Sequence, residues 1–154
     1  MNGIPEAVLV AATVGNGLLA GVFFAFSCGV VPGMRQVDDL SYVTVFRAIN
    51  RSIVNRLFIL VFLGAPIATV AATALHFDAA RREAVLVAAL VLCLFSFAVT
   101  VLVSVPLNDR LGTAPIGDAQ GRKEARDRFE MRWNGWNQVR TATSAAALVV
   151  LAIA

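Results

Sequence analysis

Three long apolar runs, separated by short polar stretches, dominate the first two thirds of the chain. They cover residues 7–31, 54–75 and 84–105. Each run, as a helix rising about 1.5 Å per residue, is long enough to cross a hydrocarbon core of about 30 Å. The pattern therefore predicts three transmembrane helices. The first is expected to end at the turn signal Pro32-Gly33 and the third just before Pro106.

The C-terminal apolar run predicts a fourth span only if polar residues are included. The apolar tail, residues 142–154, measures about 20 Å as a helix and is too short to cross. A helix that starts at Trp133 measures about 33 Å and does cross. We therefore predict a fourth span over 133–154, with the polar segment 133–140 entering the membrane interface. A charged helix over 122–132 is expected to lead into it.

The first loop, residues 32–53, is also patterned. Within residues 40–50 and just beyond, Val45, Ile49 and Val54 recur at amphipathic spacing, which predicts a short helix lying along the interface. The predicted fold class is all-α. It is a single-domain integral membrane four-helix bundle over residues 1–154, with a short interfacial helix in the first cytoplasmic loop.

Composition supports a membrane protein over a soluble one. Hydrophobic residues make up 58% of the chain and charged residues 15%, whereas soluble domains have about 45–50% and about 25%. The net charge of +3 comes from basic residues beside the spans, so membrane lipid is the expected partner and nucleic acid is not.

The basic residues also predict an orientation. They divide 11 to 2 between the two sides of the membrane. By the positive-inside rule, loops 32–53 and 106–132 are expected in the cytoplasm and both termini outside. A bacterial inner membrane is the expected location.

Cysteine and histidine are too few for a metal centre with several such ligands, because the chain has two cysteines and one histidine, His76. Cys28 and Cys93 are expected at depths about 18 Å apart, whereas the Cα atoms of a disulfide lie within about 7 Å. We therefore predict free, buried thiols.

Polar residues gather near the cytoplasmic ends of the predicted spans. Trp133, Asn137 and Arg140 share one helical face, and Arg51 and Asn55 repeat the four-residue spacing at the start of the second span. One interpretation is a pocket for an aromatic, oxygen-rich ligand. The other is an interfacial belt of Trp, snorkelling Arg and capping Asn residues. Deeper in the membrane lies mainly Asn16, with Thr69 and Ser96, while Pro66 should kink the second span.

Three motifs carry a family resemblance. They are residues 17–26 with Val31-Pro32-Gly33, residues 49–58, and Trp133-Asn134-Gly135-Trp136-Asn137-Gln138-Val139-Arg140. In this order, with four predicted spans, they resemble the anthrone oxygenase family of small membrane proteins. The resemblance covers nearly the whole chain. It implies an oxygenase that oxidises a lipophilic aromatic substrate with O₂ and uses no cofactor or metal.

An anthrone has an acidic C–H group, so such an enzyme needs a base, oxyanion donors and an apolar pocket. The candidate catalytic residues are amides that would donate to the oxyanion, an arginine that would stabilise the enolate, and a carboxylate near the proposed mouth: Asn50, Asn55, Asn137, Arg140 and Asp109. The candidate substrate-binding residues are Trp133, Trp136, Asn134, Arg51, Ser27 and Asn16.

Two other functions are compatible with the sequence. A non-catalytic scaffold, or a protein that binds a quinone or another hydrophobic ligand, would also present small residues for close packing, as Gly17 and Gly21 do, within the chain or in a homo-oligomer. A small transporter is less well supported, since no inverted repeat or charge at the membrane midplane is visible. Consumption of O₂ would separate the oxygenase from both.

Overall fold

The computed structural model describes residues 3–76 and 80–154, and no strand occurs among them. The chain forms α1 (Gly3–Ala25), a π-helical turn (Phe26–Val30), α2 (Val31–Met34), α3 (Asp39–Ile53), α4 (Arg56–Leu75), α5 (Ala80–Val99), a second π-helical turn (Thr100–Ser104), α6 (Val105–Thr113) and α7 (Ala119–Ala152). The prediction of an all-α fold is confirmed.

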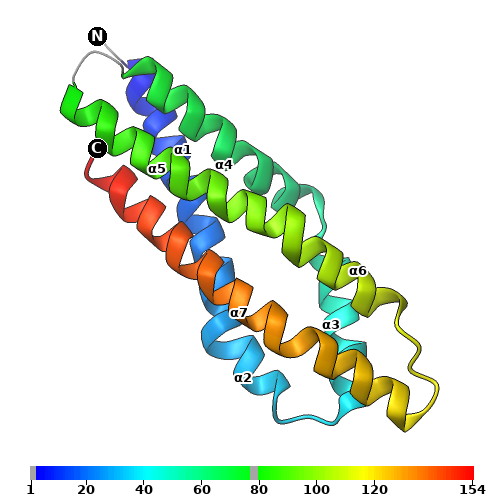
Figure 1. Cartoon of the computed structure of the whole chain (residues 1–154). Coiled ribbons are helices and arrows are strands. Elements are labelled where there is room, and N and C mark those ends of the chain that lie inside the picture. The colour runs from blue at the N-terminus through cyan, green and yellow to red at the C-terminus, as the bar shows by residue number, and fades with distance from the viewer. Residues whose placement is uncertain (1–2, 77–79) are drawn as a thin grey trace.

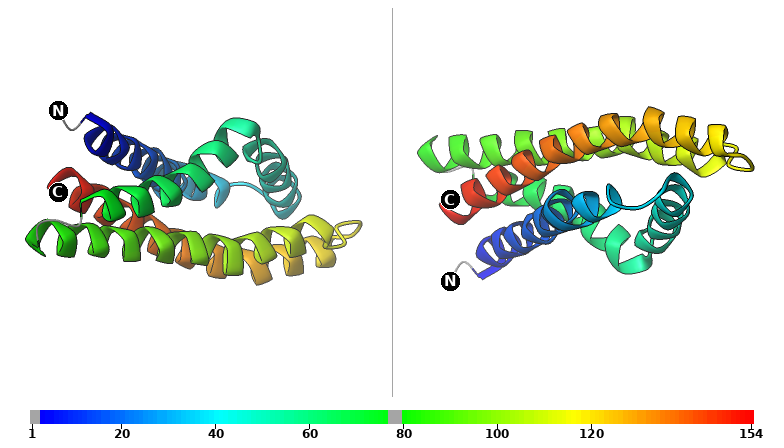
Figure 2. Two further views of the ribbon diagram at one scale, coloured as in Figure 1. Left: turned by 90° about the horizontal axis from the view of Figure 1, so that it is seen from above. Right: turned by 90° about the horizontal axis from the view of Figure 1, so that it is seen from below.

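Four long helices run side by side (Figure 1). Helix α1 packs against α4 and α7, and α5 packs against α7 and α4. Figure 2 shows α5, α6 and α7 in one layer, with α1 and α4 in the other. Both termini lie at one end of the molecule, and α2, α3 and α6 lie at the other end.

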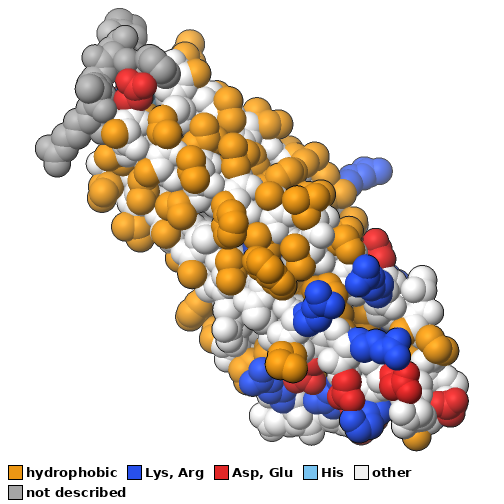
Figure 3. Space-filling model, viewed as in Figure 1, with side chains coloured by type: hydrophobic (Ala, Val, Ile, Leu, Met, Phe, Trp, Pro, Cys, Tyr) orange, Lys and Arg blue, Asp and Glu red, His pale blue; other side chains and the backbone are white. Residues whose placement is uncertain are grey.

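Within the described residues, three helical segments are long and apolar enough to cross a membrane: Gly3–Met34, Arg56–Leu75 and Arg82–Thr113. Large apolar side chains also cover their outer faces, including Leu57, Leu60, Ile67 and Leu102. A soluble protein rarely exposes so continuous an apolar surface. Most Lys and Arg side chains visible in Figure 3 gather at the α6 end, beyond this surface. The chain is therefore an integral membrane protein.

The first and third spans continue past the prolines that were expected to follow them. Helix continues through Pro32 to Met34 and through Pro106 to Thr113. A π-helical turn lies just upstream of each proline, over Phe26–Val30 and Thr100–Ser104. Proline has no N–H and its ring crowds the preceding turn, and the wider π geometry is a known way to accommodate such a disruption without ending the helix.

Helix α3 confirms that a helix forms in the first loop, and one of its faces is covered by the rest of the protein. Tyr42, Val43 and Phe46 are fully buried, whereas Val45 and Val54 are exposed. Asp38 caps the helix by accepting hydrogen bonds from the backbone N–H groups of residues 40 and 41. The buried face packs against α7, so tertiary contact decides which side of α3 is covered. Its position along a membrane interface stays a prediction.

The expected charged helix and the residues of the expected fourth span form one continuous helix, α7, of 34 residues, about 51 Å long. Helix α7 is not among the three described segments that are long and apolar enough to cross a membrane, so the fourth span stays a prediction. The first half of α7 lies beside α3 and α6, where Phe46 packs edge-on against Phe129 and Trp133 at ring distances of 4.7 and 4.9 Å. Arg126 on α7 forms an ion pair with Asp39 on α3 at 3.1 Å and with Glu130 on its own helix at 2.7 Å. Burial acts to lower the pKa of Arg126, but these two carboxylates outweigh it and leave the pKa raised.

Two expectations about small residues need correction. The tightest helix approach is at Gly15, where an added Cβ would lie 3.0 Å from Ala65, whereas Gly21 has open space around it. Both cysteines are free, as predicted, and Cys93 is buried, but Cys28 is exposed. Cys28 lies in the first π-helical turn, none of whose residues is buried, so its position on the outer face of the bundle exposes it.

Candidate functional site

The most unusual polar group in the described structure is the Arg140 side chain on α7, which is 5% exposed. Its guanidinium lies between two aromatic rings, with Cζ 4.4 Å from the Phe23 ring centre and 5.3 Å from that of Trp133. Among the described residues, no carboxylate lies within 4.0 Å of it, since none of the ion pairs includes Arg140. The site thus holds a buried cation without a counter-ion.

Asn137 connects Arg140 to α1. Its amide nitrogen donates to the backbone carbonyl of Phe23 at 3.0 Å and to Ser27 Oγ at 2.8 Å. Its carbonyl oxygen accepts from Arg140 Nη2 at 2.9 Å. These partners determine the orientation of the amide, because only the nitrogen can donate.

Two hydroxyl groups complete the connection. Thr141 Oγ1 donates to the Asn137 backbone carbonyl at 2.9 Å, so Ser27 Oγ, at 3.0 Å, donates to Thr141. On the other side of Arg140, Thr100 Oγ1 donates to the Ser96 carbonyl at 3.0 Å and accepts from Arg140 Nη1 at 3.4 Å. We call these five residues the Arg140 cluster: Ser27, Thr100, Asn137, Arg140 and Thr141.

Both π-helical turns contribute to this cluster, since Ser27 lies in the first and Thr100 begins the second. A π-helical turn disturbs the regular hydrogen-bond ladder and often lies at a functional site. Here the two turns flank α7 on either side of Arg140.

Several buried polar atoms near the cluster lack hydrogen-bond partners within the described residues. Both amide atoms of Asn134, the Trp133 indole nitrogen, Arg140 Nε and Ser104 Oγ are among them. Ser96 bonds Ser144, and Thr100 bonds Arg140. Because the two helical segments run antiparallel, continuing this register by one turn places Ser104 opposite the turn of α7 that precedes Asn137. Unpaired buried polar groups each cost about 1–3 kcal/mol. Buried groups of this kind are rare in native proteins and often accompany a catalytic role or a bound ion or water.

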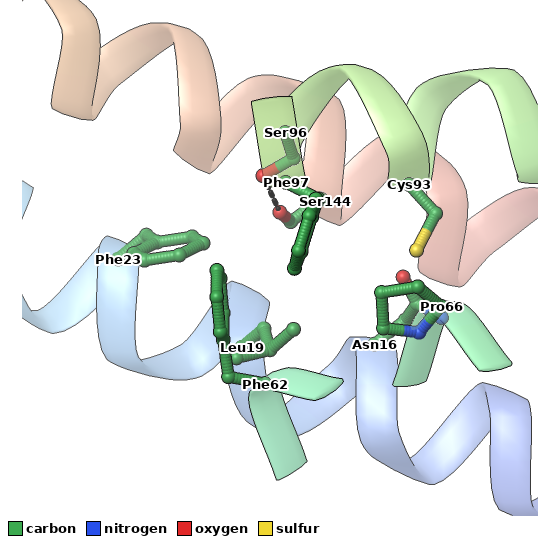
Figure 4. Close-up of a pocket in the computed structure, with 9 residues that line it drawn as sticks. All are labelled: Asn16, Leu19, Phe23, Phe62, Pro66, Cys93, Ser96, Phe97 and Ser144. Atoms are coloured by element: carbon green, nitrogen blue, oxygen red, sulfur yellow. Dashed lines mark hydrogen bonds between the residues drawn. The ribbon is translucent and has the colours of Figure 1, made fainter. Parts of the chain in front are cut away.

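A small cavity of about 10 Å³ lies next to the cluster. Figure 4 shows the residues that surround it. They come from α1, α4, α5 and α7, and they are Asn16, Leu19, Phe23, Phe62, Pro66, Cys93, Ser96, Phe97 and Ser144. The Phe23 ring lines the cavity and also contacts the Arg140 guanidinium. The cavity is far too small for an aromatic ring system.

A larger groove of about 710 Å³ lies between α6 and α7, at the charged end of the molecule. Leu107, Leu111 and Phe129 contribute apolar surface, while Arg110 and Arg132 contribute positive charge. Its volume is within the range of small-molecule sites. Leu107, Leu111 and Phe129 belong to the same buried apolar cluster as Trp133. Because Trp133 also contacts the Arg140 guanidinium, this apolar cluster connects the groove with the Arg140 cluster.

The structure brings together only some of the residues that the sequence singled out. Asn137, Arg140 and Ser27 are hydrogen bonded, Trp133 lies over the guanidinium, and Asn134 is buried one turn before Asn137. Asn16 is buried deeper, where it donates to Thr69 Oγ1 at 3.0 Å and lines the small cavity.

The other candidates lie elsewhere. Asn55 is exposed and caps α4 by accepting from the Phe58 N–H group at 3.0 Å. Arg51 and Asp109 are exposed, Asn50 is half-buried, and Trp136 is 37% exposed. None of these five makes a hydrogen bond or ring contact to the Arg140 cluster in the described structure.

The sequence interpretation missed two partners of Arg140, Phe23 and Thr100, and it missed Ser144, which lies one turn after Arg140 and bonds Ser96. Single Phe, Thr and Ser residues in apolar spans are common, so residue type alone does not reveal them. A weak signal was present, since Ser96, Thr100 and Ser104 repeat every four residues on one face of the third span.

Comparison with protein-family models matches the family described as anthrone oxygenase over residues 52–150. The matched region includes Thr100, Asn137 and Arg140, whereas Phe23 and Ser27 precede it. Comparisons with curated proteins and with solved structures gave no significant match. The match covers more than half of the chain and agrees with the helical, membrane-spanning architecture, so this protein belongs to the anthrone oxygenase family.

Proposed function

We propose that this protein is a membrane oxygenase that oxidises a lipophilic, enolisable aromatic substrate with O₂ at the Arg140 cluster. The observation that carries the proposal is the buried guanidinium with no carboxylate beside it. A charged arginine at the centre of a membrane helix costs about 2.5–3.5 kcal/mol. An anionic ligand, such as an enolate, would offset this cost.

The cluster favours electrostatic stabilisation over general-base catalysis. The described residues in contact with Arg140 are Asn, Thr and aromatic side chains, none of which is an effective base at neutral pH. A cation within about 4–6 Å lowers the pKa of an acidic group by about 1–3 units. Arg140 would therefore shift a bound substrate toward its enolate, while its proton leaves to water at the charged end. Asp109, the carboxylate expected as base, is exposed on α6.

The oxidation balances without a further reductant. The enolate carbon transfers electrons to O₂ and, with one proton, forms a C–O bond, which gives a hydroperoxide on the former CH₂ carbon. Loss of the second C–H proton and cleavage of the O–O bond then yield the ketone and water. One oxygen atom enters the product and the other enters water. In this sequence Arg140 stabilises the enolate oxygen, and the amide groups of Asn134 and Asn137 orient the substrate.

A polycyclic substrate does not fit beside Arg140 in the described arrangement, since the adjoining cavity is about 10 Å³. Binding therefore requires the contact between α7 and the Thr100–Ser104 turn to separate. The unpaired atoms of Trp133 and Ser104 make this contact weaker than a fully bonded one. The groove between α6 and α7 offers the substrate a first binding position, because Phe129 in the groove packs in the same apolar cluster as Trp133.

A matched pair of variants tests the proposal. Thr100→Asp places a carboxylate where Oγ1 now lies 3.4 Å from Arg140 Nη1, while Thr100→Asn has nearly the same shape and no charge. In purified protein in lipid nanodiscs, with a phenolic anthrone as substrate, Thr100→Asp should lower kcat/KM by about 10²-fold or more, because its carboxylate replaces the enolate as counter-ion. Thr100→Asn should stay within about tenfold of the natural protein.

Isotope labelling supplies the second measurement. With ¹⁸O₂, one labelled atom should appear in the product ketone and one in water. Equal activity in the Thr100→Asp and Thr100→Asn variants, with both folded, would show that the uncompensated charge of Arg140 is not used. Absence of O₂ consumption by the natural protein with a panel of anthrones and phenols would refute the oxygenase function itself.

A second function is favoured by the groove between α6 and α7. Its apolar surface and its arginines Arg110 and Arg132 fit an amphiphilic anion or a quinone, which a non-catalytic protein would hold without converting. Tight binding of such a ligand without O₂ consumption, abolished by Phe129→Asp in the groove and unaffected by Thr100→Asp, would favour this function over the oxygenase.

We also propose that the charged end faces the cytoplasm of a bacterial inner membrane. The support is the concentration of basic residues at the end opposite to both termini. Cysteines introduced at Gly117 or at the C-terminus would test it. In intact cells a membrane-impermeant maleimide should label only the C-terminal site, and the reverse pattern would invert the topology.

A further inference from the structure

The small cavity beside Phe23 has walls from all four packed helices (Figure 4). Its volume of about 10 Å³ corresponds to roughly one water-sized probe, so it accommodates one very small molecule. Phe62 and Phe97 stack at 4.8 Å and form one side of it. Pro66, which lacks an N–H group, lies within α4 on the same wall.

The lining is mainly apolar: Leu19, Phe23, Phe62, Pro66 and Phe97. Its polar lining consists of Asn16, Cys93, Ser96 and Ser144, and most of their hydrogen-bonding atoms, apart from the Asn16 side-chain carbonyl oxygen, have partners in the protein. The hydroxyls of Ser96 and Ser144 bond each other at 2.8 Å, and the Asn16 amide nitrogen donates to the Ala12 carbonyl at 2.9 Å and to Thr69 Oγ1 at 3.0 Å. A buried water needs about two to four polar partners. The cavity is therefore better suited to a small apolar molecule than to water.

The position of the cavity connects it with the Arg140 cluster. The Phe23 ring lines the cavity, and its centre lies 4.4 Å from Arg140 Cζ. Ser96 and Ser144 lie one helical turn from Thr100 and Arg140 on the same faces. A molecule in the cavity and the Arg140 guanidinium thus both lie beside the Phe23 ring.

We infer that this cavity is a binding site for dioxygen, which waits there to react with a substrate bound at Arg140. The inference rests on the proposed oxygenase function for its purpose, although binding of a small apolar gas stands on the cavity alone. Dioxygen is small, apolar and soluble in lipid, so it reaches this site through the membrane. Holding it next to the enolate replaces a random encounter by a positioned one.

Two substitutions on α1 make a matched test. Leu19→Phe adds volume at the cavity wall, where Leu19 is 7% exposed, whereas Leu18→Phe makes the same change at a neighbour that is 53% exposed. Crystals pressurised with xenon should show an anomalous peak in the cavity of the natural protein and of Leu18→Phe, and none in Leu19→Phe. Phe62→Leu changes the cavity in the opposite direction to Leu19→Phe, because it enlarges the cavity. It should increase xenon occupancy.

Turnover gives the second readout. Leu19→Phe should raise the KM for O₂ by about tenfold or more while the KM for the aromatic substrate changes less than about twofold, and Leu18→Phe should change neither. An ordered water in place of xenon in the natural protein would overturn the inference. So would an unchanged KM for O₂ when xenon binding is lost. If the natural protein consumes no O₂, the oxygenase function fails, and the xenon experiment still decides whether the cavity holds an apolar gas.

Discussion

The Arg140 cluster predicts very different effects for two neighbouring asparagines on α7. Asn137 and Asn134 are of the same residue type, one turn apart, and are 1% and 5% exposed. The Asn137 side chain makes three hydrogen bonds, to Phe23, Ser27 and Arg140, whereas neither amide atom of Asn134 has a partner in the described structure. Substitution by alanine removes the same atoms at each position. The difference between the two variants therefore measures the contribution of the hydrogen bonds apart from that of burying an amide.

The magnitude follows from the number of bonds. Side-chain hydrogen bonds between membrane helices contribute about 0.6 kcal/mol on average and up to about 1.7. Three such bonds imply that Asn137→Ala lowers the free energy of unfolding by about 2–5 kcal/mol. The Arg140 bond is charge-assisted and supports the upper half of this range. Asn134→Ala removes no bond and relieves two unpaired atoms, so its cost should be below about 1 kcal/mol.

The assay is reversible unfolding in mixed detergent micelles, titrated with sodium dodecyl sulfate and followed by tryptophan fluorescence. Trp133 lies 5.3 Å from the Arg140 guanidinium and reports directly on this region. Ser27→Ala removes the hydrogen bonds of Ser27 with Asn137 and Thr141 but keeps the bond between Asn137 and Arg140. It should lower the free energy of unfolding by an intermediate amount. Equal losses for Asn137→Ala and Asn134→Ala would refute the assignment of the structural role to Asn137. If Asn134 serves the ligand, Asn134→Ala should instead lower turnover by about tenfold or more.

Three further predictions concern the charged end. Phe46→Ala empties a fully buried position in contact with Trp133 and should lower the free energy of unfolding by about 3–5 kcal/mol in the same titration; a loss below about 1 kcal/mol would contradict the described packing. Arg126→Met removes the ion pair of α7 with Asp39 and should speed amide exchange along α3 by about tenfold, with no change in α5. Hydrogen bonds from Ser41, first its side chain and then its backbone, hold the pKa of Asp38 below its usual 3.8. The stabilisation by Asp38 is therefore complete well above pH 3.8 and is lost as the pH falls through the lower folded-state pKa. The protection of amides at the start of α3, measured against their intrinsic exchange rates at the same pH, should fall in acid, and Asp38→Asn should abolish that pH-dependent loss of protection.

Local sequence patterns determined the helical elements of this protein. The long apolar runs predict the first three spans, because their length and hydropathy depend only on residues that are adjacent in the chain. The length argument extended the last apolar run only back to Trp133, and the charged stretch 122–132 was a separate helix prediction; both lie within α7, which begins at Ala119. The motif Trp133 to Arg140 also contains Asn137 and Arg140, the buried pair at the centre of the Arg140 cluster.

The tertiary structure decided which polar residues meet. Asn50 and Asn55 looked equivalent to Asn137 in the sequence, since each lies near the cytoplasmic end of a predicted span. Asn55 instead caps its own helix, a local use that its side chain satisfies without any long-range partner. Asn137 faces α1, where Ser27 and the Phe23 carbonyl receive its amide protons.

The partners of Arg140 illustrate the physical reason. Arg140 is 117 positions from Phe23 and 40 from Thr100 in the chain. Its contacts with them therefore depend on how α1, α5 and α7 are rotated against one another. That rotation is determined by packing over the whole interface and, in this chain, by the two π-helical turns upstream of Pro32 and Pro106. Local periodicity specifies that a helix forms and how long it is, whereas the burial of an arginine without a counter-ion emerges only when four helices pack together.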